Sequence, residues 1–198
     1  MSSCLKQNNT MKKTILLFIL CIVHCTLCIS QTIYKFAIHD EINSKTWIYT
    51  QQALKEANTL RPDLIILHLN TYGGEVTYAD SIRTAILRTE TPIVAYIDNN
   101  AASAGALISI ACDRIYMRSG SQIGAATVVN GMDGSKMPDK YQSYMRATMR
   151  ATAESHGKDS LGHWRRDPLI AEAMVDESVY IKGIIDTGKI LTFTTKEA

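Results

Sequence analysis

The pattern of hydrophobic and polar positions predicts alternating strands and helices along the chain. Residues 32–40 (TIYKFAIHD) alternate apolar and polar side chains, which is typical of a half-exposed first strand. Residues 44–58 instead carry apolar side chains at helical intervals, and the helix that they predict ends near Pro62. The positions expected on its inner face are Trp47, Ile48, Leu54 and Ala57.

Three further apolar runs predict strands at residues 63–69, 92–97 and 113–117. The first, DLIILHL, is short and continuously apolar, which is the mark of a buried parallel strand. Residues 76–87 between the first two runs predict a helix with one apolar face. That face consists of Val76, Ala79, Ile82 and Ile86. Strands separated by helices of this length form right-handed βαβ units, so the pattern predicts an α/β fold.

Two of the predicted strand ends carry chemically special residues. Gly73 and Gly74 follow the strand at 63–69, and Ser103 follows the strand at 92–97 in the stretch SAGALISIA. Reactive groups collect at such junctions of an α/β sheet, because helix N-termini present unpaired N–H groups. Backbone N–H groups from the two turns can converge on a carbonyl oxygen beside the Ser103 hydroxyl, which outlines an oxyanion hole.

A purely structural explanation competes with the catalytic one at both places. A serine at a helix start is most often an N-cap, and a glycine pair after a strand is most often a turn that requires positive φ. Neither signal is specific by itself. Their order along the chain, namely strand, GG, helix, strand, S-A-G-A, helix, strand, is much more restrictive.

A nucleophilic serine needs a base, and the histidines of this chain offer no sharp candidate. Two lie on strand patterns before the glycine pair, one lies in the N-terminal apolar run, and two flank Gly157 on the expected solvent side. In chain order they are His24, His39, His68, His156 and His163. A lone histidine of this kind is more often a surface or core residue than a catalytic one.

Lys140 is the better candidate for the base. Asp139 after Pro138 predicts the N-cap of a helix that runs to Gly157, and Lys140 stands in its first turn. The face expected to be shared along this helix comprises Tyr141, Met145, Thr148 and Thr152. The helix macrodipole is positive at this end, so both the dipole and any desolvation favour the neutral amine, which can accept a serine proton. A solvated surface lysine is the plain alternative, and Lys136 is a rival four residues upstream.

Three segments together resemble the ClpP-class serine protease domain of the NfeD family, the partners of stomatin-like membrane proteins. They are NTYGGEVTYADSIRTAI (70–86), the stretch 92–129 with its S-A-G-A and I-G-A-A elements, and DKYQSYMRATMRATAESHG (139–157). The resemblance covers residues 32 to 198. It implies a ClpP/crotonase-like α/β fold of repeated β-β-α units with a mostly parallel sheet. It also implies a Ser-Lys dyad, homodimers or larger assemblies, and cleavage of apolar peptide or membrane-protein segments, with a stomatin- or prohibitin-like protein as partner.

The same resemblance assigns the site residues. The nucleophile position falls on Ser103, and the general-base lysine at the start of the last helix falls on Lys140. The oxyanion-hole donors fall on the backbone N–H groups of Gly74 and Ala104, and the substrate is expected to lie along Gly73 and Gly74. The implied reaction is acyl transfer: the serine attacks a peptide carbonyl, the lysine moves the proton, and water releases the acyl group.

Departures from the pattern narrow the assignment. In the ClpP proteases proper the triad histidine lies in the segment that here reads SGSQIGAATVV, and residues 119–129 contain no histidine. A Ser-His-Asp triad is therefore not expected. Tyr72 stands before the glycine pair, where a proline is usual in the wider class. The final stretch, GKILTFTTKEA, resembles a strand and the first turn of a helix, from which we expect the domain to be truncated.

The N-terminal residues predict export. MKKTILLFILCIVHCTLCIS (11–30) has the lysines, the apolar run and the small final residues of a secretory leader, with Met11 as an alternative start. Its apolar run is shorter than the roughly 20 residues of a bilayer span, which favours cleavage near Gln31 over anchoring. We therefore expect a leader at 1–30 and a protease domain at 31–198. That domain would lie in the periplasm or at the outer face of the plasma membrane, free or held by an uncleaved leader.

Charge and cysteine content exclude some classes of function. The chain carries a net charge of +2, and residues 1–30 hold three lysines and no acids, so the remaining domain is close to neutral. A nucleic-acid binder needs a basic excess on one face, so this class is not expected. Of the five cysteines Cys112 alone lies after residue 30, which leaves no internal disulfide. The chain has no Walker loop, no GxGxxG and no zinc-ligand spacing, so no cofactor is expected.

Two functions from other classes stay open at this point. A crotonase-type acyl-CoA enzyme would use the same two N–H groups to polarise a thioester, but it would need neither Ser103 nor Lys140. A membrane-protein assembly factor would keep the fold without catalysis.

Overall fold

Six strands form one sheet in the computed structural model, which describes residues 31–198. The predicted leader at 1–30 lies outside the described residues. Along the sheet the order is β1-β2-β3-β5-β6, and β4 pairs with β3 beside this path. The strands are β1 (Ile33–Ile38), β2 (Leu64–Thr71), β3 (Ile93–Ala102), β4 (Arg114–Met117), β5 (Gln122–Gly124) and β6 (Thr192–Thr194).

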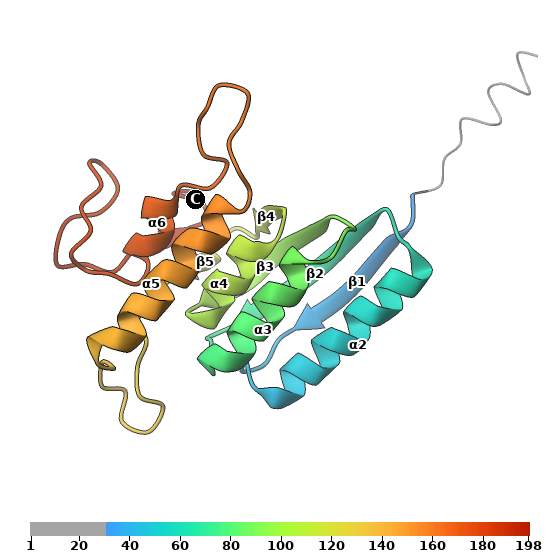
Figure 1. Ribbon diagram of the computed structural model, residues 1–198, viewed down its shortest axis with the longest axis horizontal. Coiled ribbons are helices and arrows are strands. Elements are labelled where there is room, and N and C mark those ends of the chain that lie inside the picture. Colours follow the sequence, from blue (N-terminus) through green and yellow to red (C-terminus); the bar gives the residue numbers. More distant parts are fainter. Residues whose placement is uncertain (1–30) are drawn as a thin grey trace, which may run out of the picture. The chain divides into compact units, whose positions relative to one another are not determined.

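Three helices lie together on one face of this sheet, and two more follow in the C-terminal third (Figure 1). In chain order they are α2 (Ser44–Leu60), α3 (Val76–Leu87), α4 (Ala104–Ala111), α5 (Asp139–Glu154) and α6 (Pro168–Ala173). Because α2, α3 and α4 connect successive strands, β1 to β4 all run parallel, as the sequence pattern predicts. The succession β4-β5-α5 is the described β-β-α unit, and β6 returns antiparallel to β5.

β3 organises the sheet because its two halves pair with different strands. Its first half pairs with β4, from Val94 opposite Arg114, and its second half pairs with β5, from Asn100 opposite Gln122. Both β3 and β5 therefore end beside Ser103, the residue that follows β3. The sequence pattern indicated neither the three-residue β5 nor the six-residue α6, since such short elements show no periodicity.

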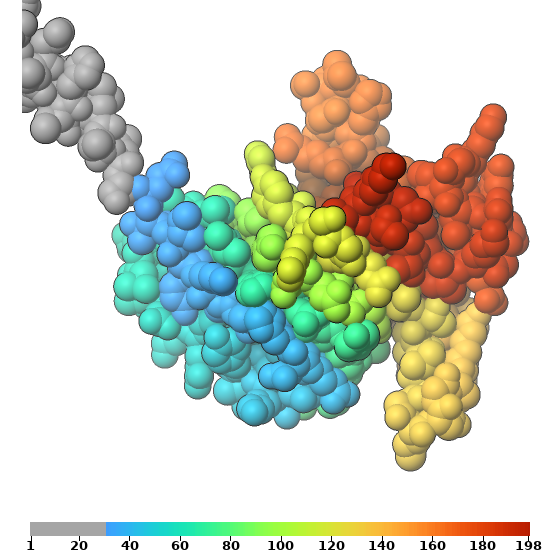
Figure 2. Space-filling view, turned by 180° about the vertical axis from the view of Figure 1, so that it is seen from behind, coloured from blue at the N-terminus to red at the C-terminus, as the bar shows by residue number. Residues whose placement is uncertain are grey.

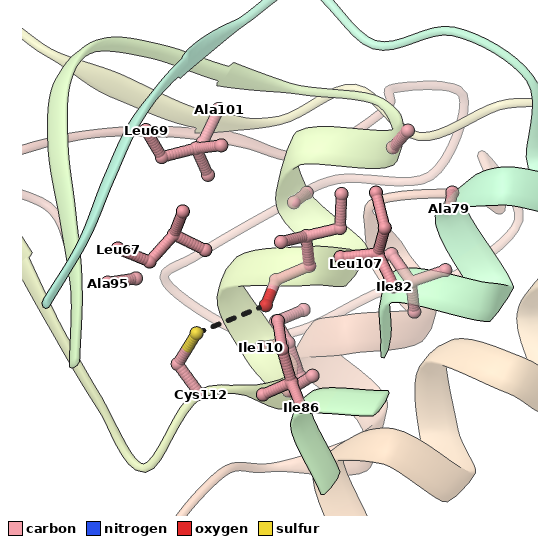
Figure 3. Packing of buried hydrophobic residues seen from close by; sticks show 14 of the residues in the cluster. Leu67, Leu69, Ala79, Ile82, Ile86, Ala95, Ala101, Leu107, Ile110 and Cys112 are labelled. Atoms are coloured by element: carbon pink, nitrogen blue, oxygen red, sulfur yellow. Dashed lines mark hydrogen bonds between the residues drawn. The ribbon is translucent and has the colours of Figure 1, made fainter. Parts of the chain in front are cut away.

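The core lies between the sheet and the three helices that cover it (Figure 3). Aliphatic side chains of β2 and β3 meet those of α3 and α4 there. Labelled examples are Leu67, Leu69, Ala95, Ala101, Ile82, Ile86, Leu107 and Ile110. Cys112 is buried beside them as a free thiol, and its Sγ lies 3.4 Å from the carbonyl oxygen of Ile108. Burial raises the pKa of this thiol to about 12, so Cys112 contributes to core packing and is not expected to react as a thiolate.

The predicted inner face of α2 was partly wrong. Ile48 is 53% exposed, whereas Thr46 and Thr50 point inward. The buried hydroxyl of Thr50 donates to the carbonyl oxygen of Thr46 at 2.8 Å, so no unpaired polar group remains. A threonine that is satisfied one turn back can therefore replace an apolar residue on this face.

The start of α5 also differs from the prediction. Pro138 is the N-cap residue, and Asp139 lies in the first turn, where it accepts a hydrogen bond from Arg146. Tyr141, Met145 and Thr152 were expected to share a face, but Met145 and Thr152 are buried whereas Tyr141 is 41% exposed, and Gln142 beside it is buried. The reason is a polar contact from outside the helix, described below, that the apolar pattern does not encode.

Candidate active site

Ser103 joins β3 to α4 in a strained backbone conformation. Its φ is 55° and its ψ is −118°, values that cost about 1–3 kcal/mol in a non-glycine residue. Ser103 occupies the N-cap position of α4, but its side chain makes no capping hydrogen bond. The N-cap explanation therefore accounts for the position and leaves the hydroxyl unused.

Contacts from β5 hold this conformation in place. The N–H of Ser103 donates to the carbonyl oxygen of Gly124 at 2.9 Å, and its carbonyl accepts from the N–H of Ala106 at 2.9 Å. Gly124 has φ 138°, and a Cβ there would lie 2.4 Å from the carbonyl oxygen of Leu191. The strand pair β5–β6 is thus packed tightly enough to fix the serine backbone.

The glycine pair brings a second turn directly against Ser103. Gly73 has φ 114°, and a Cβ there would lie 2.6 Å from the Cβ of Ser103 and 3.0 Å from its Oγ. Gly74 has φ 148°, and a Cβ there would lie 2.2 Å from the carbonyl oxygen of Ile42. Both positions require glycine, because their φ is positive and because Ser103 and Ile42 leave no room for a side chain. The explanation as a turn and the explanation as part of a site are therefore compatible.

Thr71 anchors this turn from below. Its Oγ1 accepts the N–H of Gly73 at 3.1 Å and donates to the carbonyl oxygen of Asp40 at 2.8 Å. Ile42 then bridges to the turn, since its N–H donates to the carbonyl oxygen of Gly73 and its carbonyl accepts from the N–H of Glu75. The segment after β1 and the turn after β2 thereby form one rigid unit.

The predicted oxyanion donors are not engaged elsewhere. Neither the N–H of Gly74 nor that of Ala104 has an acceptor among the described residues. Gly74 lines the same pocket as Ser103, and Ala104 is the first residue of α4, where an N–H has no partner within the helix. Two free donors of this kind beside a hydroxyl suit a tetrahedral oxyanion, and their role stays a prediction.

Ser103 opens onto a pocket of about 740 Å³. Its apolar lining consists of Tyr72, Val76, Ala102, Ala125, Val129 and Ile190. Glu41, Glu75 and Thr127 supply the polar side chains at its border. Tyr72 is 79% exposed, so the residue that replaces the usual proline leaves the pocket open at this side.

Lys140 stands in the first turn of α5, as predicted, but its amine lies outside this pocket. Its side chain is exposed, and its Nζ lies 4.9 Å from the ring centroid of Tyr141. A cation–π contact and hydration both favour this placement of an ammonium group. Lys136 lies elsewhere again, with its Nζ 2.9 Å from Oε1 of Glu177. The structure therefore brings neither lysine to Ser103.

Hydrogen bonds from a side chain of α5 to the backbone of the pocket wall nevertheless link the start of α5 to the pocket. The buried side chain of Gln142 accepts from the N–H of Val128 at 3.0 Å and donates to its carbonyl oxygen at 2.7 Å. The neighbours of Val128, Thr127 and Val129, line the pocket. Lys140 thus lies in the first turn of a helix that is tied to the pocket wall two residues further on, at Gln142.

The histidines lie away from Ser103. His156, predicted on the solvent side, is instead half-buried, and its Nε2 lies 2.7 Å from the carbonyl oxygen of Ile110 at the far end of α4. Burial, and then the charge of Arg166, lower the pKa of His156. In the described part of the chain, no histidine lines the pocket. The segment 119–129, where ClpP proteases carry their triad histidine, contributes Ala125 to the pocket instead.

Comparison with known proteins now defines the family. The family model described as "NfeD1b, N-terminal domain" matches residues 32–198. The chain belongs to this family. Membrane protein NfeD1b of Bacillus subtilis is 32% identical over 169 residues, which cover 85% of this chain and 37% of the relative. Membrane-bound protease PH1510 of Pyrococcus horikoshii is 27% identical over 135 residues, 65% of this chain and 31% of that protein. The chain thus spans about a third of the length of both relatives.

Solved structures confirm the predicted fold. A lysine-to-alanine variant of the 1510-N membrane-bound stomatin-specific protease, in complex with a substrate peptide, matches with a TM-score of 0.70 at 24% identity. The match covers 85% of this chain and 71% of that one. ClpP1 from Listeria monocytogenes matches with a TM-score of 0.57 at 14% identity, over 83% of this chain and 84% of that one. The fold is therefore ClpP-like. Within residues 31–198, no helix has the length and hydrophobicity that crossing a membrane requires.

Proposed function

We propose that this domain is a serine peptidase that cleaves apolar peptide segments through an acyl-enzyme on Ser103. The observation that carries the proposal is the strained, uncapped serine, which lies against Gly73 at the wall of an apolar pocket. A packing role alone gives no reason to maintain that strain. Further support comes from the relative named a membrane-bound protease and from the ClpP-like fold.

In the proposed reaction, Oγ of Ser103 attacks the carbonyl carbon of the scissile peptide bond as its proton passes to the base. The N–H groups of Gly74 and Ala104 hold the oxyanion of the tetrahedral intermediate. The base returns the proton to the leaving amine, which leaves an ester on Ser103. Water then attacks this ester and regenerates the hydroxyl. Ser103 and the two donors need no rearrangement for these steps, because the turns that carry them are already packed together.

In this reaction we assign the role of the base to Lys140. For that, its Nζ has to leave the ring of Tyr141 and reach the pocket, which requires a different conformation of the side chain and of the loop before α5. The link between Gln142 and Val128 supports it, because ordering of the pocket wall by a bound peptide acts directly on the start of α5. Solved structures of the 1510-N protease include a serine-to-alanine and a lysine-to-alanine variant, which also supports a Ser-Lys pair.

The proposed substrate is an apolar segment of a membrane protein, with a stomatin-like protein as the first candidate. The pocket lining is mostly apolar, and the 1510-N protease is named as specific for a stomatin homolog. Both curated relatives are named as membrane proteins, in keeping with the proposed action of the exported domain at the outer side of the membrane. Assembly as a dimer or larger oligomer belongs to the same proposal.

Labelling with a fluorophosphonate probe, followed by hydrolysis of an apolar fluorogenic peptide, tests the assignment. We expect Ser103→Ala to abolish labelling and Lys140→Ala to slow it by about 10²-fold or more, as the loss of a general base does. Lys136→Ala is the matched control, because this lysine lies four residues upstream in the loop before α5 and pairs with Glu177, and it should label at the normal rate. Labelling that persists in Ser103→Ala contradicts the proposal.

A non-catalytic assembly factor is the second candidate, and the exposed position of Lys140 favours it. It predicts no labelling and no peptide hydrolysis by the folded wild-type chain. Turnover of an acyl-CoA thioester that survives Ser103→Ala would instead support the crotonase-type alternative. The same set of variants therefore separates all three functions.

A further inference from the structure

The sheet has a second face that the described helices do not cover. α2, α3 and α4 lie on one side of β1 to β4, and Figure 2, seen from behind, looks at the other side. Parallel sheets occur almost always with both faces covered, and their strands are then apolar on both sides. The run LIIL at the start of β2 fits that rule, although every second residue of β2 remains partly exposed. This face is therefore built to be covered.

The strand register arranges this face in rows. Lys35, Ile66, Val94 and Arg114 are paired across β1, β2, β3 and β4. Ala37, His68, Tyr96 and Tyr116 form the next row two residues further along. The first row thus has the apolar side chains of Ile66 and Val94 at its centre and a cation at both ends, while the second row has two aromatic rings, His68 and Tyr96, at its centre.

A hollow of about 410 Å³ lies on this face. Its lining consists of Leu64, Ile66, Val94, Tyr96, Arg114 and Tyr116. These six residues and Lys35, which is paired with Ile66, are called the open face below. Tyr116 is 54% exposed and Tyr96 is 36% exposed, so two aromatic rings and aliphatic side chains meet water in one patch. Clustered exposure of this kind marks an interaction surface more often than scattered apolar residues do.

The charges around the hollow select the kind of partner. Asp98, at the end of the face, is already paired with Arg118 at 2.9 Å, a hydrogen bond that lowers the pKa of this carboxyl group. Lys35 and Arg114 have no carboxylate partner among the described residues. The face therefore carries excess positive charge. A second copy of the chain would bring like charges together, whereas an acidic partner would neutralise them.

From these contacts we infer that the open face docks a segment of a protein partner. Its apolar side chains fill the hollow between Ile66, Val94 and Tyr96, and its carboxylates pair with Lys35 and Arg114. The docking face is the side of the sheet opposite α4, whose first turn follows Ser103. It leaves the serine pocket free and does not depend on catalysis.

Fluorescence anisotropy of a labelled synthetic peptide tests this inference with the full chain carrying Ser103→Ala. The probe is a peptide of about 15 residues with leucines at helical spacing and glutamates beside them. We expect Arg114→Glu to weaken its binding by about tenfold or more. A matched peptide with lysines in place of glutamates should bind the double variant Lys35→Glu/Arg114→Glu better than the wild type. Lys55→Glu, on α2 at the covered face, is the control and should change affinity less than about twofold.

Three results would overturn the inference. The first is equal binding of the glutamate peptide to the wild type and to Arg114→Glu. The second is a wild-type dimer in sedimentation that Arg114→Glu dissociates, which would assign the face to a second copy. The third is binding to phosphatidylglycerol vesicles that Arg114→Glu abolishes while the peptide fails to bind, which would assign it to a bilayer. Because no arm measures catalysis, failure here leaves the proposed peptidase function untouched.

Discussion

Ser103 and Lys140, the two residues proposed to act together, lie in opposite kinds of surroundings. Ser103 is held by backbone hydrogen bonds to Gly124 of β5 and Ala106 of α4, and by Gly73, which approaches it so closely that a Cβ on Gly73 would lie 2.6 Å from the Cβ of Ser103. Lys140 is exposed and rests on a neighbouring ring. The comparison teaches that the fold fixes the proposed nucleophile and the turns that carry its proposed oxyanion donors, whereas the proposed base lies outside the pocket and has to move to reach them. Perturbing each region separately can therefore break or sharpen this division.

The largest effect is expected at the turn that contacts the serine. Gly73→Ala places a Cβ 2.6 Å from the Cβ of Ser103 in a backbone conformation that disfavours side chains, so the turn must move. Displacement of the adjoining oxyanion donor should lower the fluorophosphonate labelling rate by about 10²–10³-fold. The control is Gly120→Ala, which also has a positive φ of 88° but where a Cβ meets no atom within 4 Å, and it should label at the normal rate. Equal rates for both variants would mean that the turn is not part of the site.

Core packing behind the serine should give the next largest effect. Leu107 is fully buried in α4, and its N–H approaches the carbonyl oxygen of Ser103 at 3.4 Å. Leu107→Ala should lower the free energy of unfolding by about 2–5 kcal/mol, measured by urea denaturation. Leu169→Ala, at an exposed position of α6, is the matched control and should change it by less than about 0.5 kcal/mol. A small effect at Leu107 would show that the serine-bearing helix is less firmly packed than the contacts indicate.

The link between the two regions should have a moderate effect. Gln142→Leu removes a buried amide and leaves the N–H of Val128 without its partner, while the carbonyl of Val128 keeps the hydrogen bond from the N–H of Met137. Unpaired groups of this kind cost about 1–3 kcal/mol of stability. Labelling of Ser103 should also slow, because the pocket wall at Thr127 and Val129 loses its tie to α5. Gln51→Leu on the exposed side of α2 is the control, and unchanged labelling in both variants would separate α5 from the site.

The smallest expected effect is a dependence of stability on pH. Burial lowers the pKa of His156, and burial first of all also lowers that of His68, so the unfolded chain binds protons that the folded chain does not. Stability is then constant above the unfolded value of about 6.5 and falls as the pH drops below it, until the folded groups protonate. Urea titrations between about pH 7 and pH 5 measure the slope. His156→Gln should reduce the slope without removing it, since His68 remains, and an unchanged slope would contradict the assignment.

Much of the fold could be predicted because its signals are local. The apolar runs that became β2, β3 and β4 and the periodic stretches that became α2, α3 and α5 lie close to where the pattern placed them. The position of Ser103 between a strand and a helix, and of a glycine pair after the preceding strand, followed from the same order of elements. Such features depend on residues within one or two turns of each other.

The inner faces and the side-chain partners could not be predicted in this way. Ile48 was assigned to the interior and is exposed, while Gln142 is buried because it bonds to a loop outside its own helix. His156 is held by a carbonyl oxygen at the other end of the domain's central helix, 46 residues away in sequence. Contacts of this kind are decided by which segments the fold brings together.

The sequence by itself determined the order of strands and helices, the junction that holds Ser103 and the need for glycine at 73 and 74. The tertiary structure decided that the serine is strained and makes no capping hydrogen bond, that the N–H groups of Gly74 and Ala104 have no acceptor among the described residues, and that the Lys140 amine lies outside the serine pocket. It also decided that the helices within residues 31–198 leave one face of the sheet uncovered. The physical reason is that backbone preference and periodicity act over a few residues, whereas strain, burial and charge pairing depend on neighbours that are distant along the chain.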